Sequence, residues 1–288
     1  MKKYKTAYNH LKAFEKDEKY KVTYETINLD FFYKYTTYLR KKYSLSQNTI
    51  ARDIKTIKVF MGEAVDLGET TNFQFKHKKF SVSQTETDSI YLDENEIFKF
   101  YSFDLHKNKR LEQVRDLFVF GCFVGLRFSD YSNIKPENIV NIEEDSFIKI
   151  KTQKTGELVI IPCNPVVLEI FKKYDHNINK LPKAPSNQKF NNYIKEAAML
   201  AGLNEKGRLT TQPEKALWEC ISSHTARRSM ATNYYLQGFP TYDLMKITGH
   251  KTESAFLKYI KITKLDTAKR LSAHIKKNWS GKLLKVAS

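Results

Sequence analysis

The chain has 288 residues, of which 49 are lysine or arginine and 32 are aspartate or glutamate, so its formal charge is +17 and its pI is near 9.5. An excess of this size favours a polyanionic partner, because binding a polyanion releases its counterions, and nucleic acid is the default candidate. The sequence has no run of eighteen apolar residues and no apolar N-terminal segment, which argues against membrane insertion and secretion.

The three cysteines predict neither disulfide bonds nor a metal site. Cys122, Cys163 and Cys220 are far apart in the sequence, and none belongs to a Cys-x-x-Cys pair. We therefore expect an intracellular protein without a cofactor or a metal, in which the cysteines pack as small apolar residues.

Residues 1–82 predict an all-α helical bundle. Helical patterns cover, in order, about residues 4–19, 30–43 and 46–67. Asp30 is the expected N-cap of the second helix, and Gly68 is the expected C-terminal cap of the third. The third pattern is the clearest, because apolar residues recur at steps of three and four: Ile50, Ile54, Ile57, Phe60 or Met61, Ala64 and Leu67.

A polar segment separates this bundle from the rest of the chain. Residues 81–89 are small, polar and aperiodic, which is the composition of an exposed linker. We place the linker at residues 83–90 and a second domain at residues 91–288. Residues 1–85 hold 17 basic and 9 acidic residues, against 32 and 23 in the longer remainder, so the N-terminal part is the more densely basic. This balance is expected of a domain that contacts DNA.

The second domain is predicted to be mixed α+β and mainly helical, with a small β-sheet or hairpin. Helical patterns cover residues 93–101 and 110–124, and alternating apolar and polar residues around a glycine-containing turn predict a hairpin over residues 147–161. A last helix is expected after Tyr259, because these residues share one helical face: Ile262, Leu265, Ala268, Leu271, Ile275 and Trp279.

Several polar groups lie at the edges of apolar segments in this domain. His224 and Arg227 are three residues apart and share one face if this stretch is helical, so both could bind one oxyanion. Tyr259 lies nine residues after His250 and is either a core residue or a nucleophile. The other candidates are Arg127, with Asp130 three residues later to orient its guanidinium, and Lys154 near the hairpin tip, with Lys151 as the alternative.

In this combination the sequence resembles the tyrosine recombinases, the integrase family. The residues that carry the resemblance are Gly125-Leu126-Arg127 with Asp130, Lys154 in Gln153-Lys154-Thr155, His224-x-x-Arg227, Gly249-His250 and Tyr259. The phrases around His224 and His250 are most similar to integrases of bacterial mobile elements. The resemblance implies a bacterial, cytoplasmic and nucleoid-associated recombinase, with an N-terminal SAM-like core-binding domain and a C-terminal catalytic domain.

The resemblance also implies residue roles. Tyr259 would attack the scissile phosphate to form a 3′-phosphotyrosyl intermediate, Arg127, Arg227 and His250 would bind the phosphate oxygens, and His224 would assist removal of the phenolic proton. Lys154 would protonate the leaving oxygen. The expected partner is double-stranded DNA, bound by a protein that is monomeric or weakly oligomeric when free and tetrameric on paired sites, with an accessory DNA-bending protein as a further candidate. The final helix would pack either on a neighbouring subunit or on its own domain.

Candidate DNA contacts follow from the same resemblance, although each residue could equally belong to an ordinary solvated face. They are Tyr33, Lys34, Lys41, Lys42, Asn48, Thr49, Arg52 and Lys55 in the bundle and Arg228 in the second domain. Three other functions remain open: DNA relaxation by a type IB topoisomerase, DNA binding without catalysis, and metal-dependent cleavage. The last is the least favoured, because the motifs contain no cluster of metal-ligating residues.

Overall fold

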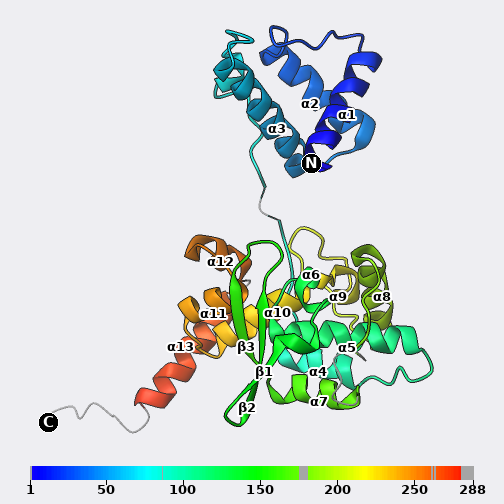
Figure 1. Ribbon diagram of the computed structural model, residues 1–288, viewed down its shortest axis with the longest axis vertical. Helices are drawn as coiled ribbons and strands as arrows, with labels where there is room; N and C mark the ends of the chain where they lie inside the picture. The colour runs from blue at the N-terminus through cyan, green and yellow to red at the C-terminus, as the bar shows by residue number, and fades with distance from the viewer. Residues whose placement is uncertain (1, 86, 175–180, 261, 263, 280–288) are drawn as a thin grey trace, which may run out of the picture. The chain divides into compact units, whose positions relative to one another are not determined.

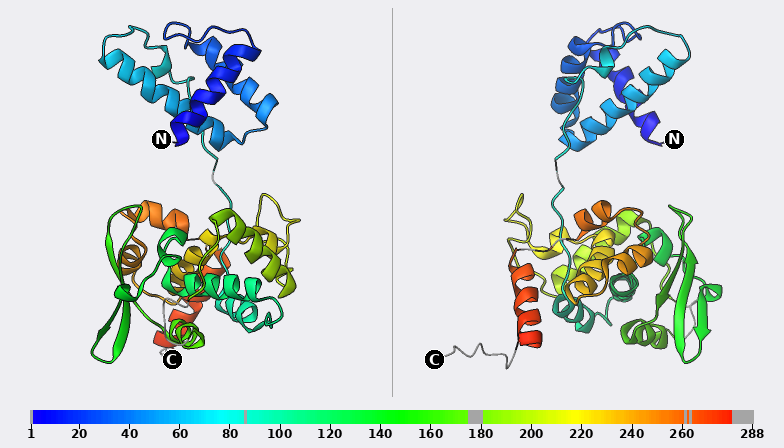
Figure 2. Two further views of the ribbon diagram at one scale, coloured as in Figure 1. Left: turned by 45° about the vertical axis from the view of Figure 1, so that its right-hand side comes forward. Right: turned by 90° about the vertical axis from the view of Figure 1, so that its left-hand side faces the viewer.

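The structure is a computed structural model that describes residues 2–85, 87–174, 181–260, 262 and 264–279. The chain divides into two compact units, Met1–Thr87 and Asp88–Ser288, each with its own hydrophobic core (Figures 1 and 2). Within the described ranges, no helix is both long and apolar enough to cross a membrane.

The N-terminal unit is all-α, as the sequence predicts. Its elements are α1 (Lys2–Asp17), α2 (Leu29–Tyr43), α3 (Gln47–Asp66) and the short 3-10 helix η1 (Gln74–Lys76). The predicted cap of α2 is wrong: Asn28 is the N-cap and accepts a hydrogen bond from the Phe31 amide at 3.0 Å, whereas Asp30 lies in the first turn. Gly68 follows α3 with a φ of +75°, a left-handed conformation that glycine adopts without strain.

Aromatic side chains fill the core of this unit. Phe14 of α1 packs edge-on against Phe31 and Tyr35 of α2, with ring centroids 5.7 and 5.3 Å apart, and all three are fully buried. The apolar stripe of α3 closes the other side of this core through Ile50, Ile54, Ile57 and Met61. Most of the aromatic cluster of α2 is therefore structural, whereas Tyr33 remains 53% exposed.

The second unit is mainly helical with one small sheet, as the sequence predicts. Its helices are α4 (Glu94–Ser102), α5 (Lys109–Val124), α6 (Phe128–Tyr131), η2 (Pro136–Asn138), α7 (Pro165–Lys173), α8 (Asn187–Leu200), α9 (Leu217–Cys220), α10 (Ser223–Leu236), α11 (Thr241–Thr248), α12 (Glu253–Tyr259) and α13 (Lys264–Trp279). Its strands are β1 (Ile139–Ile142), β2 (Asp145–Lys151) and β3 (Leu158–Pro162), in the antiparallel order β1-β2-β3.

The sheet lies at one edge of this unit (Figure 2). The predicted hairpin is formed by β2 and β3, with Ile148 opposite Ile161 and Lys151 opposite Leu158. The four-residue β1, which pairs Ile139 with Ile148, was not predicted. Along β2 and β3, buried and exposed residues alternate, so one face of the sheet covers the core.

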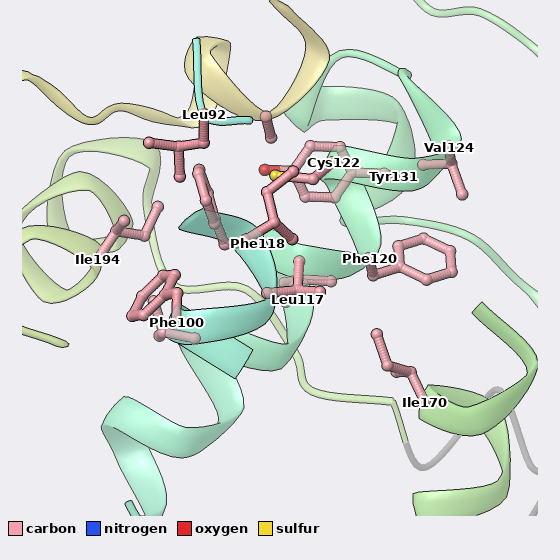
Figure 3. Packing of buried hydrophobic residues seen from close by; sticks show 14 of the residues in the cluster. Leu92, Phe100, Leu117, Phe118, Phe120, Cys122, Val124, Tyr131, Ile170 and Ile194 are labelled. Carbon is pink, nitrogen blue, oxygen red and sulfur yellow. The ribbon is translucent and has the colours of Figure 1, made fainter. Parts of the chain in front are cut away.

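Helices α5 and α10 form the centre of the core. Nearly every residue of α5 from Val114 to Val124 is buried, and Figure 3 shows several of its side chains packed among those of neighbouring elements. Gly121 permits this packing, because a Cβ at this position would lie 2.9 Å from the ring of Tyr131 and 3.2 Å from Ala226 of α10. The end of α5 is thereby held against α10, where the candidate site begins.

The segment that connects the units is attached at both of its ends. Asn48 of α3 donates to the Thr85 carbonyl and accepts from the Thr85 amide, both at 2.9 Å. Asp88 accepts hydrogen bonds from Thr210 and Thr211, and Ile90 is buried in the core of the second unit. The domain bounds 1–82, 83–90 and 91–288 remain a prediction.

The predicted final helix corresponds to α13. Leu271 and Ile275 are 60% and 47% exposed, while the Arg270 guanidinium lies 4.6 Å from the ring centroid of Tyr235 on α10. Leu265 and Trp279, which the predicted face also included, have side chains outside the described part of the chain.

Candidate active site

Arg127 is placed by the end of α5. Gly125 terminates this helix with a φ of +66°, and Arg127 then acts as the N-cap of the short α6. The Nη1 atom of Arg127 is buried and has no hydrogen-bond partner in the described part of the chain. An unpartnered buried guanidinium nitrogen is costly, and an incoming anion could satisfy it.

Asp130 lies near Arg127 but makes a different contact from the expected one. Its Oδ1 accepts a hydrogen bond from the Gln153 amide at 2.9 Å, and within the described residues no ion pair joins it to Arg127. Asp130 is fully buried, so this bond fixes the turn between β2 and β3 against α6. Its effect is therefore on the loop that carries Lys154.

Lys154 lies in that turn, where its side chain is exposed. Gly156, with a φ of +69°, helps to close the turn, and the Thr152 amide donates to the Glu157 carbonyl at 2.9 Å. Glu157 also pairs with Lys251, which follows His250 in the chain, at 3.4 Å. The turn is thus fastened both to α6 and to the segment between α11 and α12.

His224 and Arg227 both lie in α10, as their spacing predicts. Arg227 is 2% exposed; its Nη1 donates to the Gly125 carbonyl at 3.0 Å and its Nη2 to the Thr248 carbonyl. These bonds hold the guanidinium between the ends of α5 and α11. Burial lowers the pKa of Arg227 to about 10, so it remains cationic at neutral pH.

His250 follows Gly249, which terminates α11 with a φ of +61°. The Nδ1 of His250 lies 2.8 Å from the Thr248 hydroxyl oxygen, so this threonine orients the ring and influences its tautomer. Burial, with the charges of Arg227 and Arg127, lowers the pKa of His250 to about 4. The ring is therefore neutral at pH 7.

Tyr259 is the last residue of α12. Its hydroxyl donates to the His224 carbonyl at 3.3 Å, and its ring centroid lies 5.1 Å from that of His250. The guanidinium carbons of Arg227 and Arg228 lie 5.9 and 4.9 Å from the centroid of the tyrosine ring. Burial raises the pKa of the phenol, while the nearby arginine charges oppose that rise.

The electrostatics of His224 indicate that these groups converge. Loss of hydration lowers the pKa of its imidazole, and the positive charges of Arg228, Arg227, Lys154 and Arg127 lower it further, in that order. The six residues of the motif thus come from several elements, with His224 and Arg227 sharing α10, and they form one cluster of cations and neutral imidazoles around a phenol. Such a cluster fits a phosphate group.

Two contributors to this cluster lacked a sequence signal for the contacts they make. Thr248 precedes Gly249-His250, but nothing in the sequence indicates that its hydroxyl meets the imidazole. Arg228 was predicted only as a DNA contact, and its guanidinium lies over the ring of Tyr259. No group of three or more His, Cys, Asp or Glu side chains in the described ranges could hold a metal ion.

The candidate DNA contacts of the N-terminal unit have different surroundings. Lys34 pairs with Asp30 at 2.8 Å, Lys42 pairs with Asp17, and the Asn48 amide is bonded to Thr85. Thr49 lies in the first turn of α3, where its amide donates to Ser46. Tyr33, Lys41, Arg52 and Lys55 are exposed, as are the two paired lysines, Lys34 and Lys42.

Comparison with known proteins gives matches along most of the chain. Residues 1–82 match the family model of the phage integrase SAM-like domain, and residues 91–265 match that of the phage integrase family. No curated protein sequence gives a significant match.

The fold is similar to those of several solved structures. A lambda integrase dimer bound to a COC′ core site has a TM-score of 0.67 at 15% identity, over 90% of this chain and 87% of that one. The Tn1549 transposon integrase in complex with circular intermediate DNA has a TM-score of 0.65 at 18% identity, over 91% and 90%. The XerH site-specific recombinase bound to a palindromic difH substrate has a TM-score of 0.63 at 16% identity, over 92% and 76%.

Proposed function

The chain belongs to the phage integrase family, and we propose that it is a tyrosine-type, site-specific DNA recombinase that integrates or excises a mobile element. The observation that carries the proposed chemistry is the environment of Tyr259. Its phenol lies beside two guanidinium groups and two histidines, at the centre of the cation cluster. This is the arrangement that an in-line displacement at phosphorus requires.

In the proposed reaction, the Tyr259 oxygen attacks the scissile phosphate. A bond forms between this oxygen and phosphorus, the bond from phosphorus to the 5′ oxygen breaks, and the products are a 3′-phosphotyrosyl link and a free 5′-hydroxyl. His224, whose lowered pKa keeps it neutral at pH 7, assists removal of the phenolic proton. Lys154, on its anchored turn, gives a proton to the departing 5′ oxygen.

Positive and polar groups stabilise the charge that develops on the phosphate. Arg127 and Arg227 bind the two nonbridging oxygens, and His250 contributes a further hydrogen bond. Support comes from the unpartnered Nη1 of Arg127 and from the rigid attachment of Arg227 to two backbone carbonyls.

The covalent link retains the energy of the phosphodiester bond, so a 5′-hydroxyl from another strand can reverse the step without ATP. Two such exchanges on paired sites would recombine two duplexes through a four-way junction. We therefore propose double-stranded DNA as the partner and a tetramer on paired sites as the active assembly. The exposed residues Leu271 and Ile275 of α13 are available for packing on a neighbouring subunit.

For the N-terminal unit we propose DNA contacts by Tyr33, Lys41, Arg52 and Lys55, because these side chains are exposed and none of them forms an ion pair in the described part of the chain. Lys34 and Lys42 already have carboxylate partners, so a phosphate would have to compete with Asp30 and Asp17. They are weaker candidates. Asn48 and Thr49 are weaker for a similar reason, since both hydrogen-bond to their own unit.

Trapping of a covalent adduct tests the proposal. The substrate is a pool of labelled, nicked duplexes with a randomised centre, from which the wild-type protein selects the sequences that it cleaves. In the presence of a chelator, we expect wild type to form a covalent adduct and Tyr259→Phe to bind the same DNA without forming one. A metal requirement, or an adduct with the phenylalanine variant, would overturn the mechanism.

Two further experiments separate the neighbouring possibilities. Relaxation of supercoiled DNA without recombinant products on paired sites would favour a topoisomerase, and binding by wild type without any adduct would favour a non-catalytic DNA-binding protein. Deletion of residues 272–288 tests the tail contact. Undiminished assembly of this variant on paired sites would exclude it.

A further inference from the structure

The second arginine of the pair in α10 lies closer to the ring of Tyr259 than the first. The guanidinium carbon of Arg228 is 4.9 Å from the ring centroid of Tyr259, compared with 5.9 Å for Arg227. A cation at this distance from an aromatic ring is attracted to it. The roles proposed above use Arg227 for the phosphate and leave this contact of Arg228 unexplained.

The side chain of Arg228 is hydrogen-bonded to the first residues of the second unit. Its Nη1 donates to the Ile90 carbonyl at 3.3 Å, and Ile90 is only 3% exposed. Two further hydrogen bonds join the same segment to α10. The backbone amide of Leu92 donates to the Ser229 hydroxyl at 2.9 Å, and the side-chain amide of Asn233 donates to the Leu92 carbonyl at 3.1 Å. These hydrogen bonds therefore fix the position of the Arg228 guanidinium.

The surroundings of Arg228 are unlike those of a surface phosphate contact. Its side chain is partly buried, and its Nε is buried without a hydrogen-bond partner among the described residues. Burial also lowers the pKa of its guanidinium. A surface contact for a DNA backbone would be more readily provided by a hydrated side chain.

We propose that Arg228 is a positioning residue for the nucleophile. Its guanidinium, hydrogen-bonded to the Ile90 carbonyl, holds the ring of Tyr259 in place and stabilises the negative charge that develops on the phenolic oxygen. The inference rests on the proposed function, because it assigns Arg228 to the same cleavage step. It also links the backbone at Ile90, in the core of the second unit, to the candidate site through Arg228.

The sign of the charge effect follows from the titratable groups around the phenol. Arg227 and Arg228 of α10 and Arg127 at the start of α6 favour the phenolate, while the rings of His224 and His250 are neutral at pH 7. Tyr131 of α6 is neutral as well, because burial raises the pKa of its phenol. Removing one of these positive charges raises the pKa of Tyr259. The part of the cleavage profile that rises with pH should therefore move to higher pH when Arg228 becomes neutral.

The test measures single-turnover adduct formation against pH, on the nicked duplex that wild type selects. Arg228→Gln removes the charge but keeps a donor for the Ile90 carbonyl. We expect it to slow cleavage about 10-fold at pH 7, which is about 1.4 kcal/mol of transition-state stabilisation, and to shift the rising limb to higher pH. Arg228→Lys keeps the positive charge but lacks the branched guanidinium, which contacts both the Tyr259 ring and the Ile90 carbonyl. It should retain the wild-type pH profile and cleave about 3-fold more slowly.

The matched control is another arginine that lies over a tyrosine in the same unit. The Arg110 guanidinium is 4.3 Å from the ring centroid of Tyr193 and pairs with Glu196, and neither residue is part of the candidate site. Arg110→Gln should leave the cleavage rate and its pH profile unchanged. DNA affinity is measured for Arg228→Gln in the Tyr259→Phe background and should also remain unchanged.

The outcomes are distinct. Absence of an adduct with wild type would overturn the proposed function. If wild type forms the adduct, an unshifted pH profile for Arg228→Gln would overturn only the present inference, as would weaker DNA binding with a salt dependence reduced by about one phosphate contact. If the glutamine variant does not fold, Arg228→Lys decides: a wild-type cleavage rate would overturn the inference and a slower rate with unchanged affinity would support it.

Discussion

Substitution of Gly125 by alanine should affect both stability and catalysis. The glycine has a φ of +66°, which costs an alanine about 1 kcal/mol. An added Cβ would also lie 2.7 Å from Sδ and 3.0 Å from Cγ of the buried Met230. Overpacking of this kind typically costs about 1–3 kcal/mol, so we expect a total loss of about 2–4 kcal/mol. Because the Gly125 carbonyl binds Arg227, cleavage should slow as well.

Gly202 provides the matched control. It follows α8 with a φ of +72°, and the nearest heavy atom to an added Cβ is the Lys99 ammonium nitrogen at 4.0 Å. Gly202→Ala should therefore cost only about 1 kcal/mol and leave cleavage unchanged. Urea unfolding can be followed by tryptophan fluorescence, because both tryptophans of the sequence, Trp218 and Trp279, belong to the second unit.

A double-mutant cycle with Met230→Ala separates the steric part of the effect. If the methionine side chain causes the clash, the two substitutions should be less destabilising together than the sum of the single losses, by at least about 1 kcal/mol. Strict additivity, or equal losses for Gly125→Ala and Gly202→Ala, would refute the argument from close packing.

Three further predictions concern the proposed catalytic groups. Lys154→Ala should cleave a normal nicked duplex at least about 100-fold more slowly than wild type. It should regain most of this loss on a 5′-thio substrate, because the thiol leaving group has a pKa of about 8.5 and needs no acid. An equal defect on both substrates, or the same behaviour in Lys151→Ala, would contradict the role of Lys154 as the acid. Thr248→Val should slow cleavage about 10-fold because it removes the hydroxyl beside the His250 Nδ1, and Thr248→Ser, which keeps a hydroxyl, should cleave at the wild-type rate. Equal rates for the two variants would exclude a role of the Thr248 hydroxyl in orienting His250. The folded-state pKa of His250 is about 4, below the unfolded value of about 6.5, so the unfolded state takes up the proton first and stability falls as pH drops from about 6.5 to about 4. In urea unfolding without DNA, the stability of His250→Gln should fall less over this pH window than that of wild type. An equal fall in both proteins would contradict the lowered pKa of His250.

Local chemistry explains why the elements could be predicted from the sequence. The stripe of α3 and the glycines after α3 and α5 produce signals within a few residues of their effects. The cap of α2 was misplaced because Asn28 and Asp30 are both good capping residues, and their spacing from the core residue Phe31 decides between them. The short β1 was missed because four residues give too little alternation to distinguish a strand from a loop.

The contacts of the candidate site were less predictable than its residues. A motif identifies which side chains are present, but the atoms that they meet depend on segments far away in the chain. Asp130 was expected to bind its neighbour Arg127 and instead binds the amide of Gln153. Arg228 meets the carbonyl of Ile90, 138 positions earlier, and no local pattern encodes such a pair.

The positive groups of the candidate site lie close together, and their mutual repulsion has a consequence for substrate choice. Arg127 and Arg227 depress the pKa of His250, and Lys154 acts with the arginines on His224. Folding of the surrounding core opposes this repulsion, through the backbone carbonyls that fix Arg227 and the bond from Asp130 to the turn of Lys154. A phosphodiester placed among these groups converts the repulsion into attraction, whereas a neutral group leaves it in place. We therefore expect the folded unit to discriminate in favour of a phosphate, and we expect the transition state to gain most, because its phosphoryl oxygens carry the greatest negative charge.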